Sequence, residues 1–277
     1  MTRSEEVRRI LVALDASEHS LAALEAAAEM AARLRAELEG LYVEDSDLLR
    51  AASLPFAREL SAYGGGRREM SGASMERTLR ARAARLRRAL EAAAERAGVA
   101  WSFRTARGRV ARELLSAAEQ ADMLVVGKAG VATTRRVRAG SVARQVVSGA
   151  RRTVVVLQRG SAIGRPVLVW YDGSEAGRRA LRTGARLAES DHRNIGILIP
   201  EGAEAKRLAE GARTVLAEEG LPSRAIVVRA DLGPVLAAMR DARCRTLVLP
   251  APARLDDGRQ ASSVLLDYID CPVVLVP

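Results

Sequence analysis

Two short glycine segments carry the residues that could do chemistry in this chain. Gly127-Lys128-Ala129-Gly130 is followed after nine residues by Gly140-Ser141. The apolar run 123–126 before them predicts a buried strand, and the amphipathic stretch 142–147 after them predicts a helix. Glycines allow the backbone to approach a phosphate closely, and the N–H groups that begin a helix, with the Ser141 hydroxyl, suit an anion. The pattern therefore predicts a phosphate-binding loop.

The charges around this loop favour an anionic guest. Segment 123–144 contains no acidic residue and five basic ones, namely Lys128, Arg135, Arg136, Arg138 and Arg144. Ordinary turn glycines beside a solvated basic face are the alternative interpretation. The loop lacks the P-loop pattern, because Asp122 stands where that pattern needs glycine, and no G-x-G-x-x-G follows the first predicted strand.

Composition limits the protein class. The 277 residues are enough for two α/β domains, and 48% hydrophobic with 28% charged residues indicates a folded chain. No apolar run is long enough to span a bilayer, and the N-terminus does not resemble a signal peptide, so a cytoplasmic location is expected. Cys244 and Cys271 are expected to be buried, unpaired thiols. Neither His19 nor His192 has a second ligand at helical spacing, so no metal site is predicted.

The positive charge is concentrated in the first half. Residues 1–160 hold 28 basic and 19 acidic residues, whereas residues 161–277 hold 16 and 15. Several arginines fall on a predicted helix over 74–97, where a solvated face is the simpler interpretation. Nucleic-acid binding is disfavoured, because aromatic residues are 3% of the chain and do not alternate with the arginines.

An internal repeat organises the chain. Residues 10–18 recur as residues 167–175, each a strand, an aspartate, a capping serine and a helix. We predict domains at 1–158 and 164–277, with a linker over 158–165. Alternating β-branched and helical runs indicate parallel sheets. The predicted strands are 9–14, 37–43, 100–105, 123–127 and 153–157 in the first half, and 166–171, 194–199, 224–229, 245–249 and 273–276 in the second.

The loop spacing G-x2-G-x9-G-[ST] and the repeated Asp-x-Ser-Glu turn resemble the universal stress protein family, in a tandem form. The resemblance implies an α/β fold of two repeated domains. Each would be a five-stranded parallel sheet of order 3-2-1-4-5 with helices on both faces. The ligand site would lie where the strand order reverses, at the carboxyl ends of the first and fourth strands.

The same resemblance implies ATP as the ligand, with or without Mg²⁺. Asp15 would take the adenine or ribose edge and the backbone of Val43 would contact adenine, while Gly127, Gly130, Gly140 and Ser141 would hold the phosphates. The full implied set is Ala13, Asp15, Val43, Gly127, Lys128, Gly130, Arg138, Gly140, Ser141 and Val142. A helix cap is the alternative role for Asp15, although Ser17 is better placed for it.

The second half departs from this pattern at the residues that would bind nucleotide. Its loop begins Pro250-Ala251-Pro252 and contains Asp256-Asp257, and Trp170 stands where the first half has Ala13. Prolines remove N–H donors, and the acids repel phosphate. We therefore expect one ATP per chain, in the first half only. Residues 44–72, an insertion absent from the second half, are expected to form a partly helical lid, with plain disorder as the alternative.

Three functions remain open on the sequence. The first is an ATP-binding stress or regulatory protein that acts through a partner, with no fast catalysis. The second is a slow ATPase or nucleotide-transfer enzyme, although no catalytic set of side chains supports it. The third is an interaction module that binds no nucleotide. The fifth strands are too apolar for open edges, so the halves are expected to pair through them as a pseudo-dimer, with a homodimer of the chain as a further possibility.

Overall fold

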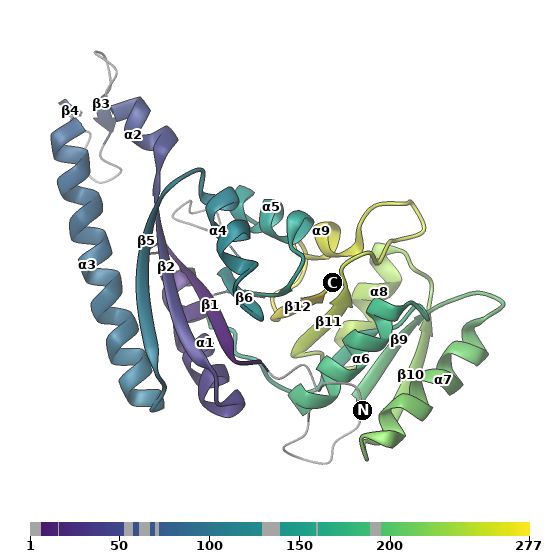
Figure 1. Ribbon diagram of the computed structural model, residues 1–277. Helices are drawn as coiled ribbons and strands as arrows, with labels where there is room; N and C mark the ends of the chain where they lie inside the picture. Colours follow the sequence, from purple (N-terminus) through teal and green to yellow (C-terminus); the bar gives the residue numbers. More distant parts are fainter. Residues whose placement is uncertain are drawn as a thin grey trace.

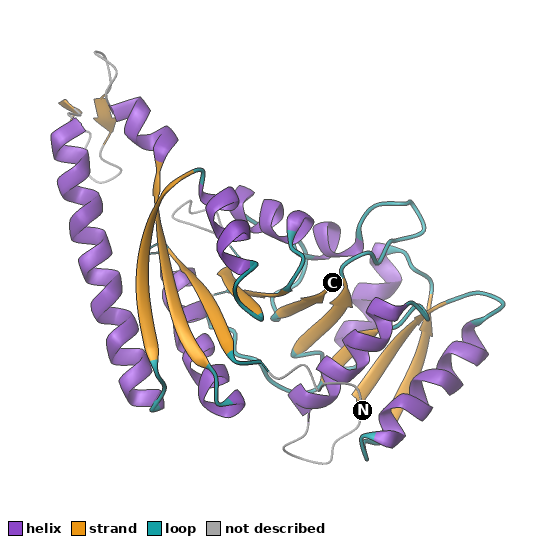
Figure 2. Cartoon of the chain, in the orientation of Figure 1, coloured by secondary structure: helices purple, strands orange, loops and turns teal. Residues whose placement is uncertain are grey.

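The computed structural model describes residues 7–15, 17–52, 58–60, 67–69, 72–128, 139–158, 160–188 and 195–277. Its central feature is one ten-stranded sheet with helices on both faces (Figure 1; Figure 2). The strand order is β10-β9-β8-β11-β12-β7-β6-β1-β2-β5, so each half contributes five adjacent strands in the order 3-2-1-4-5. The predicted fold class is confirmed.

All ten predicted strands are present, with bounds that differ by no more than three residues. The first half contributes β1 (Arg9–Leu14), β2 (Glu37–Asp45), β5 (Trp101–Gly108), β6 (Met123–Gly127) and β7 (Thr153–Leu157). The second half contributes β8 (Val167–Trp170), β9 (Ile195–Pro200), β10 (Ser223–Val228), β11 (Thr246–Pro250) and β12 (Val273–Val276). Within each half the neighbouring strands are parallel.

Two helical layers bury the sheet. Side chains alternate along each strand, so in β1 Ile10 and Val12 face one apolar cluster and Leu11 faces the other. The first cluster lies under α1 (Glu18–Leu34), α3 (Gly72–Ala97), α6 (Glu175–Ala188) and α7 (Ala205–Glu218). The second lies under α4 (Val110–Ala118), α5 (Ser141–Gly149), α8 (Leu232–Asp241) and α9 (Ala261–Leu265). Burial on both faces explains why the strands are continuous apolar runs.

The two halves meet along their fifth strands. β7 pairs with β12 in antiparallel register, with Val155 opposite Val274. The predicted pairing of these strands is confirmed, and it removes two apolar edges from solvent. That the halves form a pseudo-dimer stays a prediction, as does a homodimer.

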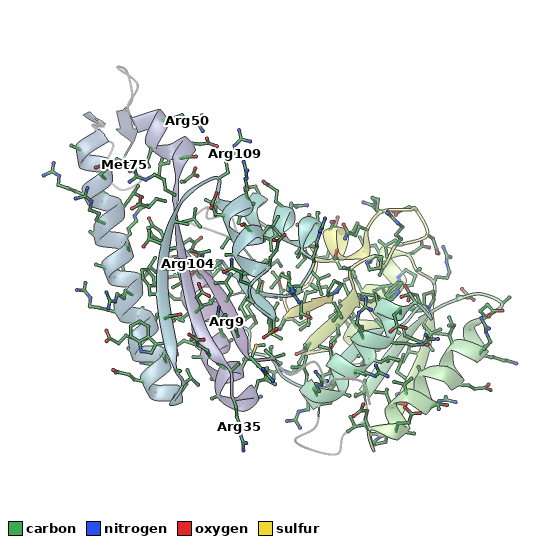
Figure 3. The ribbon with its side chains drawn as sticks, viewed as in Figure 1. Arg9, Arg35, Arg50, Met75, Arg104 and Arg109 are labelled. Atoms are coloured by element: carbon green, nitrogen blue, oxygen red, sulfur yellow. The ribbon has the colours of Figure 1, made fainter. Side chains whose placement is uncertain are left out.

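The basic residues of α3 lie on a solvated face, as predicted. Leu79, Leu86 and Leu90 are buried, whereas the arginines at 77, 80, 87 and 88 are exposed. Figure 3 likewise shows the labelled Arg35 and Arg109 pointing away from the fold. No helix of the described residues is both long and apolar enough to cross a membrane.

The insertion 44–72 is only partly described. It contains α2 (Ser46–Ala52) and a small antiparallel pair, β3 (Arg58–Leu60) with β4 (Arg67–Glu69). α2 packs on α3, β2 and β5, at the end of the molecule where Figure 1 shows these elements converging. Residues 53–57, 61–66 and 70–71 of the insertion lie outside the described residues.

Candidate nucleotide-binding site

A pocket of about 290 Å³ opens at the carboxyl ends of β1, β2 and β6, beside the N-terminus of α5. β1 pairs with β2 on one side and with β6 on the other, so the pocket lies where the strand order reverses. Open α/β sheets usually bind ligands at this position. Its lining comprises Ala13, Leu14, Asp15, Ser20, Leu41, Val43, Val110, Leu114, Val126, Gly127, Lys128, Gly140, Ser141, Val142 and Ala143.

Eight of the ten residues singled out from the sequence lie on this pocket. They are Ala13, Asp15, Val43, Gly127, Lys128, Gly140, Ser141 and Val142. Gly130 and Arg138 lie outside the described residues. The remaining lining residues were missed. Leu41 could have been found, because residues two apart on a strand share a face and Val43 was already assigned. Val110 and Leu114 could have been found in the same way, because they belong to the apolar stripe of α4 that faces the sheet.

The first turn of α1 fixes Asp15 at the pocket mouth. Asp15 Oδ1 accepts the N–H of Ser17 at 2.9 Å, and the Ser17 side chain caps the helix by accepting the N–H of Ser20 at 3.1 Å. The Ser20 hydroxyl accepts the Asp15 N–H at 3.0 Å and donates to the Ala13 carbonyl at 3.2 Å. Asp15 therefore contributes to the capping turn with one oxygen, although its side chain is exposed at the pocket.

Gly127 is required by packing as well as by the pocket. A Cβ at this position would lie 3.2 Å from the carbonyl carbon of His19 and 3.2 Å from the nitrogen of Ser20. These are backbone atoms of the first turn of α1, which cannot move aside independently. The glycine thus lets α1 approach the end of β6 closely, and this approach forms one wall of the site.

The N-terminus of α5 supplies hydrogen-bond donors. Gly140 is the N-cap residue, and its own N–H donates to the Lys128 carbonyl at 2.8 Å, which closes the base of the glycine loop. The N–H groups of Ser141, Val142 and Ala143 have no acceptor within the helix, because they precede its first turn of hydrogen bonds. Gly140 has φ −63°, a value open to any residue. A larger residue at this position would therefore act by filling space at the helix start and not by straining the turn.

Two of the predicted phosphate-binding charges are directed away from the pocket. Lys128 is 4% exposed, and its Nζ donates to the carbonyl of Ile269 at 2.6 Å. Arg144 pairs with both carboxylate oxygens of Asp267, at 2.7 and 2.6 Å. Lys128 lines the pocket, but the expectation that its charge faces an anion there is corrected, because the second half already provides its acceptor. Burial lowers the pKa of the Lys128 ammonium, and the nearby carboxylates of Asp270 and Asp267 partly oppose this effect.

Residues 6–158, more than half of the chain, match the universal stress protein family. The chain belongs to this family. The solved structure of a universal stress protein from Archaeoglobus fulgidus DSM 4304 is similar over 99% of this chain and 98% of its own, with 17% identity and a TM-score of 0.74. A putative universal stress protein from Pseudomonas aeruginosa UCBPP-PA14 is similar over 98% and 94%, with 14% identity and a TM-score of 0.62. These likenesses establish the fold. No curated protein matches the sequence.

In this universal stress protein the equivalent place in the second half is filled by side chains. Trp170, the counterpart of Ala13, is 1% exposed and lies in one apolar cluster with Ala253 and Leu255 from the loop after β11. That loop is closed by its own bonds, such as Leu255 N–H to the Arg259 carbonyl at 2.9 Å. The Asp-x-Ser turn nevertheless persists, because Asp172 Oδ1 accepts the Ser174 N–H at 3.0 Å. The turn is thus a structural feature of both halves.

Two charged side chains belong to the part of the pocket lining that the structure describes. Asp15 is the one acid and Lys128 the one basic residue there, and the Lys128 ammonium is bonded to the second half. Among the described residues no group of three or more His, Cys, Asp or Glu side chains could hold a metal ion. α2 contributes no residue to the lining, so this part of the predicted lid does not cover the pocket.

Proposed function

We propose that this universal stress protein is an ATP-binding regulatory protein with one site per chain, in the domain formed by residues 1–158. A second domain, residues 164–277, keeps the fold without the site. The observation that carries the proposal is the convergence of eight predicted residues on one pocket at the strand-order reversal. A nucleotide suits this pocket because apolar side chains and helix N-terminal donors lie at its two ends.

The lining suggests how the ligand lies. Leu41, Val43 and Leu114 form an apolar wall that fits the adenine ring. The second carboxylate oxygen of Asp15 would accept a ribose hydroxyl. The phosphates then meet the N–H groups of Ser141 and Val142, where the helix dipole favours negative charge. Mg²⁺, if it accompanies ATP, would be held mainly by phosphate oxygens and water, since the described lining offers only one carboxylate.

Slow turnover follows from the same lining. A water molecule that attacks the terminal phosphate needs a base close to the phosphates, and Asp15 lies at the opposite, ribose side of this pose. We therefore propose that bound ATP changes a surface read by a partner and is not consumed quickly. Hydrolysis at about 1 per second or faster, the ordinary range of enzymes, would contradict this assignment.

Calorimetric titration of the full chain with ATP is the test, and one site per chain is the expected result. Gly140→Val should abolish binding, because its side chain would occupy the space of a phosphate at the helix N-terminus. Gly202→Val is the matched control, since no atom lies within 4 Å of a Cβ at that position. A chain that binds no ATP, or a Gly140→Val variant that binds as the parent does, would refute the proposal.

A further inference from the structure

A short turn of the second half, residues 267–270, contacts both ends of the first half's glycine loop. At the far end of the loop, Asp267 Oδ1 accepts the N–H of Ala139 at 3.1 Å, and both Asp267 oxygens pair with Arg144. At the near end, the Ile269 carbonyl accepts the Lys128 ammonium. We call residues 267–270 the clasp. In each of these contacts the two bonded residues come from different halves and are more than a hundred residues apart in the sequence.

The contacts of Asp267 determine how the start of α5 is held. Ala139 directly precedes the N-cap residue Gly140, so the bond to Ala139 N–H fixes the peptide that leads into the helix. Arg144, one turn into α5, donates Nε–H to the Ala139 carbonyl at 3.0 Å. Asp267 and Arg144 therefore hold the N–H and the C=O of Ala139, which belong to the two successive peptide groups that flank its Cα. The Asp267 side chain is 19% exposed and that of Arg144 is 40% exposed, so solvent partly screens the ion pair, whereas the bond to the Ala139 N–H involves the more buried partner.

This arrangement leaves the next donors for a ligand. The carboxylate uses the Ala139 N–H, and the Lys128 carbonyl uses the Gly140 N–H. The following donors, on Ser141 and Val142, point from the helix end that lines the pocket. Arg144 neutralises the Asp267 charge, so the acid does not oppose an anion nearby. The acid acts on the geometry of the helix end and not on the ligand itself.

We propose that Asp267, a residue of the half that lacks a nucleotide site, is a positioning residue for the phosphate end of the site in the other half. The inference rests on the proposed function, because it concerns the ATP pocket of the first half. It gives the second half a defined task, which is to hold the loop ends where phosphate donors converge. The bonds of Asp267 to Ala139 and Arg144 lie at the start of α5, whereas the adenosine end is formed by β1, β2 and α4.

The test compares ATP with adenosine in the full chain. Asp267→Ala should weaken ATP binding by at least about fivefold, the lower range of coupling between sites. Adenosine affinity, measured by displacement of ATP, should stay within about twofold, because it does not use the α5 donors. Asp267→Asn should fall between, since its amide oxygen still accepts from Ala139 while the charge on Arg144 is unpaired. Asp270→Ala is the matched control, because that side chain is 92% exposed and 3.9 Å from Lys128 Nζ.

Hydrogen exchange at the Ala139 amide gives a second readout that needs no ligand. Exchange should accelerate in Asp267→Ala and remain unchanged in Asp270→Ala. Equal loss of ATP and adenosine affinity, unchanged ATP affinity, or unchanged Ala139 exchange in Asp267→Ala would overturn the positioning role. A parent chain that binds no ATP would instead refute the proposed function, which separates the two failures.

Discussion

Exchange of Ala13 for tryptophan tests most directly the proposal that only the first half binds nucleotide. Ala13 lines the first-half pocket, whereas its counterpart Trp170 is buried. The two backbones follow the same strand and the same Asp-x-Ser turn, so a tryptophan at position 13 meets a compatible backbone. Ala13→Trp should therefore place an indole against Leu41 and Leu114, where the proposed adenine would lie.

The size of the effect follows from the surface that the base would lose. If the indole prevents burial of roughly 100 Å² of adenine surface, binding weakens by about 2.5 kcal/mol at about 25 cal/mol per Å². That energy corresponds to a loss of nearly a hundredfold in affinity. Stability should change little, because the pocket is open and the ring displaces water and not packed side chains. Calorimetry with ATP and thermal unfolding of the same samples measure the two quantities.

The reverse change, Trp170→Ala, should not create a second site. It should destabilise the chain by about 3–5 kcal/mol through the cavity left by a large buried side chain. ATP stoichiometry should remain one per chain, because Pro250 and Pro252 have no N–H to donate and the N–H groups of Ala251, Ala253 and Leu255 are used in bonds to other carbonyls. ATP affinity unchanged in Ala13→Trp, or two ATP molecules bound by Trp170→Ala, would refute the idea that side-chain bulk and donors decide which half binds.

Three further predictions concern single residues. Gly127→Ala should lower the free energy of unfolding, measured in urea titrations, by about 1–3 kcal/mol, because the new Cβ would lie 3.2 Å from backbone atoms of α1. Gly233→Ala is the matched control, because a Cβ there would have no atom within 4 Å, and it should be neutral or stabilising. Burial lowers the pKa of Lys128 in the folded chain, so the unfolded chain binds the Lys128 proton more tightly. The resulting destabilisation is present at neutral pH and is relieved as the pH rises through the folded-state pKa toward the ordinary value of 10.5. Lys128→Met should therefore be more stable than the parent at neutral pH, and the difference should shrink in alkali. The pKa of Cys271 is lowered by its hydrogen bond with Cys244, whose own pKa is raised, so peptide mass spectrometry should find Cys271 alkylated first, and preferential modification of Cys244 would contradict this.

The sequence predicts the fold well because two signals agree at every strand. Runs such as 123–127 and 153–157 are apolar on both faces, which is typical of parallel strands covered by two helical layers. The repeat then fixes the order, since residues 10–18 and 167–175 begin the same unit twice. The pocket follows from the same logic, because the carboxyl ends of neighbouring strands meet at one edge. The free thiols were predicted, but their contact with each other was not, since Cys244 and Cys271 are brought together only by the pairing of β11 with β12.

The direction of charged side chains could not be predicted. Lys128 and Arg144 flank a glycine loop, and their sequence neighbours give no sign that Ile269 and Asp267 accept their donors. Those contacts depend on how the second half packs beside the first, which sequence spacing does not encode. The same limit applies to Asp15, whose oxygen is shared with a capping turn. Charge counts near a loop therefore do not show which cations face the pocket, because Lys128 and Arg144 are both bonded to the second half.

The two halves show which parts of a binding site the fold maintains and which it does not. The sheet, the helices and the Asp-x-Ser turn persist in both halves, because each is needed to cap a helix or bury a strand. The side chains at the ends of the first strands differ, because the first half has Ala13 where the second has the buried Trp170. The second half is also constrained where it contacts the first, as Asp267 does at Ala139. If the proposed function holds, the surface of the second half that pairs with the first is thus where its contribution to nucleotide binding is to be sought.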